Sequence, residues 1–241
     1  MHKKIVYYIL TFYVVDIMDI LLTIIYLALT FIVTLLCYKF FGKYGLIIWI
    51  CVCIIMCNIQ TVKIGEFLGL TLSLGNILYG AIFLSTDILN HKYGKHWAFH
   101  ATKLSFIVMI AFCIFMYLFL FFTPSPIDTS QSALEIIFSY VPRITFASLV
   151  AYYIGQTCDI HIFQFLKKKF NKLWLSNTGS TAVGQTVDTI LFVTIAFAGL
   201  IPGNEIIEII LTMIAVKLLI AVCDTPFMYI ANSIKKVKEI E

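Results

Sequence analysis

The sequence predicts an all-α protein that crosses a membrane several times. Of its 241 residues, 61% are hydrophobic and only 12% are charged, whereas a soluble domain is about 45–50% apolar and about 25% charged. The apolar runs are continuous and do not alternate with polar residues, which excludes the strands of a transmembrane barrel. Composition and pattern together favour a polytopic helical membrane protein.

The apolar stretches predict seven spans, because a helix rises about 1.5 Å per residue and the bilayer core is about 30 Å thick. We expect these spans at 17–38, 45–62, 70–90, 104–122, 136–166, 178–200 and 205–232. Residues 5–16 are interpreted as an interfacial lead-in. The segments FGKY (41–44), 63–69, 91–103 and 123–135 are predicted turns and loops.

Positive charge is concentrated in a few of the connecting segments. Twelve of the 17 basic residues fall in four of them: Lys39 and Lys43; Lys92, Lys95 and Lys103; Lys167, Lys168, Lys169 and Lys172; and Lys235, Lys236 and Lys238. The positive-inside rule places these segments and the C-terminus in the cytoplasm, although Lys3 and Lys4 then fall outside. The net charge of +4 is topological and does not indicate a nucleic-acid partner.

No sequence motif indicates a metal, a cofactor or catalysis. The seven cysteines lie inside apolar spans without the paired C-x-x-C spacing of a zinc site. The chain has no P-loop, no H-E-x-x-H and no intramembrane nucleophile–base set. We therefore expect neither an enzyme nor a protein that hydrolyses ATP by itself.

Two polar patterns are placed symmetrically about a basic turn. Gln156 and Asp159 precede the turn, Gln185 and Asp188 follow it, and each pair has the i, i+3 spacing that shares a helix face. In an antiparallel hairpin centred on Lys172, Gln156 lies level with Asp188, and Asp159 lies level with Gln185. Intramembrane carboxylates and amides usually line a pathway or binding site; alternatively, these four residues hydrogen-bond one another and lock the hairpin.

Further polar residues are candidates for binding or coupling. Asn58, Asn76 and Arg143 are expected toward the outer half, as pocket residues or, alternatively, as helix caps or a snorkelling side chain. Asp87, Asp224 and Lys217 are candidates for gating or coupling, with helix-end contacts as the alternative for the two carboxylates. His161 is interpreted as a satisfied core histidine.

Three stretches resemble a known family. They are GNILYGAIFLSTDILNHKYGKHWA (75–98), PRITFASLVAYYIGQTCDIHIF (142–163) and STAVGQTVDTILFVTIAF (180–197). They are similar to the VUT family of vitamin-uptake-like proteins, the bacterial queuosine precursor transporters of the YhhQ type. One departure is visible, because His91 follows Asn90 where many members have a glutamate. The similarity covers about residues 44–232.

The resemblance implies an importer of 7-deazaguanine bases in the bacterial cytoplasmic membrane. It implies a six-helix core (44–241) similar to the substrate-binding components of energy-coupling-factor transporters, preceded by an extra N-terminal segment (1–43). Asp188, then Asp159, are the expected contacts to the base edge. We expect a solitary, ion-coupled transporter, either a monomer or a homo-oligomer; the alternative is a substrate-binding subunit with partner ATPases.

Overall fold

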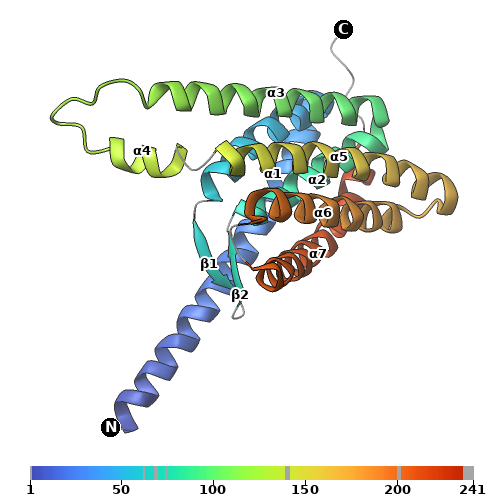
Figure 1. Cartoon of the computed structure of the whole chain (residues 1–241). Coiled ribbons are helices and arrows are strands. Elements are labelled where there is room, and N and C mark those ends of the chain that lie inside the picture. Colours follow the sequence, from blue (N-terminus) through green and yellow to red (C-terminus); the bar gives the residue numbers. More distant parts are fainter. Residues whose placement is uncertain are drawn as a thin grey trace.

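The structure is a computed structural model that describes the backbone of residues 2–61, 63–67, 70–73, 75–138, 142–199 and 202–235. These residues form seven helices and one β-hairpin (Figure 1). The helices are α1 (His2–Gln60), α2 (Gly75–Lys92), α3 (Lys95–Phe119), α4 (Gln131–Phe138), α5 (Pro142–Phe170), α6 (Leu173–Phe197) and α7 (Gly203–Ser233). The strands are β1 (Ile64–Phe67) and β2 (Leu70–Ser73), paired antiparallel. A polytopic helical membrane protein is confirmed, but the hairpin was not predicted.

Helix α1 consists of two antiparallel helices joined at Gly42. This residue has φ 57° and ψ −135°, a backbone conformation that is essentially restricted to glycine. The two arms then run side by side, since the Tyr26 hydroxyl donates to Gln60 Oε1 at 2.8 Å and Trp49 Nε1 donates to Thr34 Oγ1 at 2.9 Å. The predicted turn at 41–44 between two spans is therefore confirmed.

Helix α2 is the centre of the bundle. It contacts α1, α3, α5, α6 and α7, and every residue from Gly80 to Asn90 is buried. A helix surrounded by other helices has no lipid-facing side and can carry polar residues inward. This explains how Asp87 is accommodated in the interior of the bundle.

Some predicted boundaries were wrong. Residues 64–67 of the predicted connection form β1 and residues 70–73 of the predicted third span form β2, and α2 begins only at Gly75. The loop 91–103 is a turn at Tyr93 and Gly94, after which α3 begins at Lys95. The first turns of α3 bury Ala98 and Ala101 and expose Lys103. This part of the helix is therefore amphipathic, and it precedes the continuous apolar stretch that the sequence predicted as a span. Helix α6 likewise begins at Leu173, before the predicted residue 178.

The basic segments gather at one end of the bundle, here called the basic end. Lys43 Nζ lies 4.0 Å from the centroid of the Trp97 ring. Lys167 Nζ donates to the His91 carbonyl at 3.0 Å, and Lys92 Nζ donates to the Asn232 carbonyl at 2.6 Å. These contacts join residues from α1, α2, α3, α5 and α7, as the alternation of the loops predicted.

The outer surface suits a lipid environment. Phe115 is 71% exposed and Leu211 is 63% exposed. Within the described residues, four helices are long and apolar enough to cross a membrane: Met18–Gln60, α3, α6 and α7. The division of the chain at residue 43 stays a prediction, although Phe31 and Tyr38 of the first segment are buried in the core.

Candidate functional site

The site is built on the α5–α6 hairpin, which turns at Asn171 and Lys172. Two glycines let these helices approach closely. A Cβ on Gly155 would lie 2.9 Å from Asp188 Cβ, and a Cβ on Gly184 would lie 2.8 Å from Asp159 Cβ. The Asp188 level of α6 therefore meets the Gly155–Gln156 level of α5, and the Gly184–Gln185 level meets Asp159. The predicted mirror register is confirmed to within one residue.

The buried side of α6 is mostly polar. Its buried residues are Ser176, Asn177, Ser180, Thr181, Gly184, Gln185, Asp188, Thr189, Val193 and Ala196. Their spacing of three or four residues defines one helix face. A helix with apolar residues toward lipid and this polar stripe toward α2, α5 and α7 lines the interior of the bundle.

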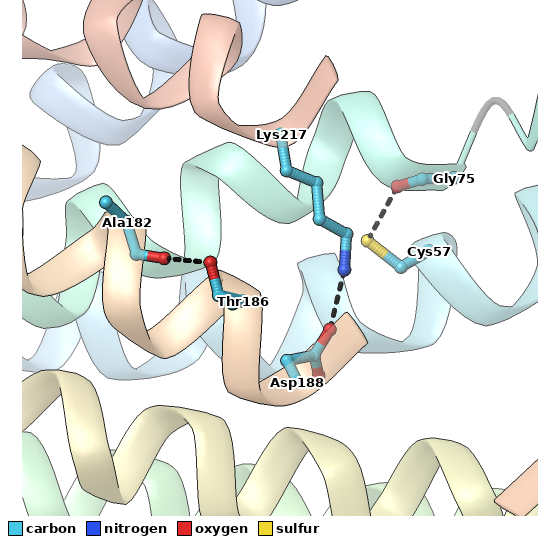
Figure 2. A network of polar contacts seen from close by, with 6 residues as sticks. All are labelled: Cys57, Gly75, Ala182, Thr186, Asp188 and Lys217. Carbon is cyan, nitrogen blue, oxygen red and sulfur yellow. Dashed lines mark hydrogen bonds and ion pairs between the residues drawn. The ribbon is translucent and has the colours of Figure 1, made fainter. Parts of the chain in front are cut away.

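An ion pair crosses the interior near the middle of this stripe. Lys217 Nζ of α7 lies 2.6 Å from Asp188 Oδ2 of α6, and both residues are buried (Figure 2). The same ammonium lies 5.3 Å from the centroid of the Tyr79 ring. Tyr79 packs edge-on against Tyr152, whose hydroxyl is 2.7 Å from Ser105 Oγ. We call Asp188, Lys217, Tyr79 and Gln156, which follows Gly155 on the turn of α5 that faces Asp188, the pair layer.

Two glutamines of the hairpin have amide atoms without a described hydrogen-bond partner. Gln156 is 0% exposed, and neither Nε2 nor Oε1 has a hydrogen-bond partner among the described atoms. Gln185 is 3% exposed, and its Oε1 has no partner there. A buried amide without partners costs about 1–3 kcal/mol. Gln156 therefore makes no described hydrogen bond that could lock the hairpin, and Gln185 Oε1 is also left without one.

A second polar group lies nearer the basic end. Asp87 of α2, Asp159 of α5 and Asp224 of α7 are each 0% exposed and interact electrostatically. From α6, Asn177 Nδ2 donates to Asp224 Oδ1 at 2.5 Å, and Thr181 Oγ1 donates to Asp87 Oδ2 at 3.3 Å. We call these five residues the carboxylate layer.

The two layers are about 10 Å apart along α7, because seven residues separate Lys217 from Asp224. The pair layer combines a carboxylate, an ammonium, an unpartnered amide and an aromatic ring. The carboxylate layer has acceptors and no described cation beside it. In these described side chains, no group of histidines, cysteines and carboxylates could hold a metal ion.

The remaining predicted residues have other positions. Asn58 donates from Nδ2 to the Ile54 carbonyl of its own helix at 2.9 Å, so its described contact is local. The side chains of Asn76 and Arg143 lie outside the described residues. His161 bonds the Thr157 carbonyl of its own helix, so its ring is satisfied, but the residue is exposed and is not the core histidine that was predicted. Asn177 and Thr181 were missed, although their positions eleven and seven residues before Asp188 place them on the same face of α6.

The part of the chain that contains both layers also matches a known protein family. Residues 73–231 match the family model described as "Putative vitamin uptake transporter". That range contains all members of both layers. The chain belongs to this family of vitamin uptake transporters. The family consists of transporters and not of enzymes, and the expected VUT resemblance is confirmed.

Curated relatives of this transporter family member extend over much of the chain. A "Probable queuosine precursor transporter" of Bacillus subtilis is 40% identical over 84% of this chain and 90% of its own length. The "Queuosine precursor transporter" of Escherichia coli is 34% identical over 55% of this chain and 58% of its own. A "Probable queuosine precursor transporter" of Haemophilus influenzae is 32% identical over 51% of each. No solved structure matches the chain.

Proposed function

We propose that this chain imports a queuosine precursor across the bacterial cytoplasmic membrane and that the pair layer binds it. The substrate is a 7-deazaguanine base, in the nitrile, aminomethyl or queuine form. The names of the relatives support this class of substrate. The chemistry of the buried side chains supports the pair layer as the place where the substrate binds.

The polar edges of such a base match the groups in the pair layer. One edge presents a ring N–H and an exocyclic amine, which a carboxylate such as Asp188 accepts in a bidentate manner. The adjacent carbonyl accepts from an ammonium or an amide, as Lys217 and Gln156 can supply. The aromatic Tyr79 and Tyr152 provide a surface for the planar ring.

The unpartnered amide of Gln156 is the observation that carries this proposal. A buried side chain that makes no hydrogen bond destabilises the unliganded protein. Such a cost is offset if the amide pairs with a ligand that brings its own polar groups into the bundle. A purely structural glutamine would instead be bonded within the protein, as Gln164 is to Asn90.

The proposed transporter works alone and is coupled to an ion gradient. Under the alternative, the chain is a binding subunit that needs partner ATPases. The absence of a P-loop in the sequence fits both arrangements. An ion-coupled transporter uses no ATP, and a binding subunit leaves ATP hydrolysis to its partners. Uptake by the purified chain in liposomes, without any added protein, distinguishes them: it occurs in the first case and is absent in the second.

The test of the site compares two glutamines of α5. We expect Gln156→Leu to leave the melting temperature unchanged or raised, because no described hydrogen bond is lost. We also expect it to weaken binding of a 7-deazaguanine base about tenfold or more, since ligand groups are left unpaired. Thermal shift and direct binding in detergent measure both quantities, with guanine and riboflavin as ligand controls.

The matched control is Gln164→Leu. This variant loses two hydrogen bonds from Gln164 Nε2 to Asn90, at 3.1 Å to the backbone oxygen and 2.5 Å to Oδ1. It should melt at a lower temperature and keep its affinity for the base. Unchanged affinity in Gln156→Leu would remove the pair layer from the site, and no binding of any 7-deazaguanine by the wild type would overturn the proposed function.

A further inference from the structure

The carboxylate layer has more negative groups than its surroundings can neutralise. Asp87, Asp159 and Asp224 come from three different helices and are each 0% exposed. The described ion pair of the interior joins Lys217 to Asp188, and no described lysine, arginine or histidine pairs with these three carboxylates. Beside these three carboxylates, helix α6 contributes only neutral groups, Asn177, Ser180 and Thr181.

Charge alone makes three ionised carboxylates untenable here. Moving one carboxylate from water into a medium of low dielectric constant costs several kcal/mol even after relaxation. Neighbouring like charges add repulsion, so closely spaced carboxylates share protons. Either a cation or protons must therefore compensate this group.

The hydrogen bonds of the layer favour protons. Within it, the buried atoms that have no partner are all acceptors: Asp87 Oδ1, both carboxylate oxygens of Asp159, Asp224 Oδ2 and Asn177 Oδ1. Asn177 is the amide member of the layer, is 0% exposed, and is held against Asp224 by its own Nδ2 while its Oδ1 stays without a partner. Protonation converts carboxylate acceptors into O–H donors, which such a group of acceptors lacks. The described histidines, cysteines and carboxylates form no group of three or more that could hold a metal ion.

We infer that Asp87, Asp159 and Asp224 form a proton-binding site, distinct from the pair layer and about 10 Å closer to the basic end along α7. The site keeps at least one proton in the closed bundle and exchanges it when the α5–α6 hairpin exposes Asp159. That this exchange drives uptake of the base rests on the proposed function.

The hairpin provides a direct link between the two layers. Asp159 packs against Gly184, and Asp188, one turn further along α6, packs against Gly155. A displacement of α6 by a ligand at Asp188 must therefore also change the environment of Asp159. The structure thus connects ligand binding to the protonation of the carboxylate layer by packing alone.

Infrared spectroscopy of the full chain, without any base present, tests proton binding. At neutral pH the wild type should show the carbonyl band of a protonated carboxylic acid. That band should be lost or shifted in Asp87→Asn, Asp159→Asn or Asp224→Asn, which imitate the neutral form and should fold. Asp128→Asn is the control, because Asp128 lies in an exposed loop and accepts hydrogen bonds from Ser130 N and Oγ, which lower the pKa of its carboxyl.

Two spectroscopic outcomes would overturn the proton site. One is a wild type without a protonated carboxyl band; the other is a band that none of the three substitutions alters. Because no base is present, this result is independent of the substrate assignment.

Transport in liposomes tests the coupling. With an acidic exterior, the wild type should accumulate a 7-deazaguanine base, whereas Asp159→Asn should bind the base and exchange it across the membrane without accumulation. Accumulation by Asp159→Asn equal to that of the wild type would refute coupling through this layer. Failure of the wild type to bind any base would instead refute the proposed function and leave the infrared result standing.

Discussion

A lysine in the interior of a membrane protein is costly unless an anion holds it, and Lys217 is held by Asp188 at 2.6 Å. Removing one partner of a buried pair leaves the other charge uncompensated, which costs about 3–5 kcal/mol, whereas removing both is often nearly neutral. The pair therefore contributes to the fold as well as to the proposed site. Substituting Asp188 and Lys217 together is therefore needed to separate their contribution to stability from their proposed contribution to binding.

We expect Asp188→Asn to unfold at a markedly lower temperature than the wild type, because the Lys217 ammonium is left unpaired. The double variant Asp188→Asn with Lys217→Met should recover most of the lost stability without recovering binding of the base. Thermal unfolding in detergent together with ligand binding measures this cycle. Additive losses of stability in the double variant would show that the two side chains are not coupled.

At the scale of the elements, the close contact between α5 and α6 depends on two glycines, Gly155 and Gly184, which have no side chain to hold the helices apart. A Cβ on Gly184 would lie 2.8 Å from Asp159 Cβ, 3.0 Å from the Gly155 carbonyl oxygen and 3.1 Å from the Phe83 ring. Because two of these neighbours belong to α5, the added methyl group must push the hairpin apart. The two glycines thus hold the pair layer and the carboxylate layer in one interior.

Gly184→Ala is therefore expected to destabilise the protein by about 1–3 kcal/mol through overpacking. Gly203→Ala at the start of α7 is the matched control, since a Cβ there meets no atom within 4 Å. Thermal unfolding of both variants provides the comparison. Equal melting temperatures for the two would mean that α5 and α6 are not in the close contact described here.

At the scale of the whole molecule, charge separates the two ends of the bundle. Lys43, Lys92 and Lys167 meet the ends of neighbouring helices at the basic end. The described part of the opposite loop, 120–130, contains Asp128 and no lysine or arginine. By the positive-inside rule we propose that the basic end and the C-terminus face the cytoplasm.

Two serine-to-cysteine variants in a cysteine-free background test this orientation. Ser125→Cys at the opposite end should react with a membrane-impermeant thiol reagent in intact cells. Ser233→Cys at the basic end should react only after the cells are permeabilised. Labelling of Ser233→Cys from outside would reverse the proposed topology.

The sequence by itself determined the class of the protein and the residues worth examining. Hydropathy and the distribution of lysines depend on the bilayer and on local chain length, so they predicted a multi-pass helical protein, the turn near Gly42 and the clustering of the basic segments. The mirror spacing of Gln156–Asp159 and Gln185–Asp188 predicted their register, because two helices joined by a tight turn must be antiparallel.

Only the tertiary structure decided how these residues are partnered. Lys217 and Asp188 are 29 residues apart, and three separate helices bring Asp87, Asp159 and Asp224 together. Long-range packing of this kind leaves no local pattern in the sequence. The β-hairpin and the helical start of α3 were missed for a related reason: short segments outside the apolar layer adopt the structure that their neighbours stabilise, and hydropathy does not record it.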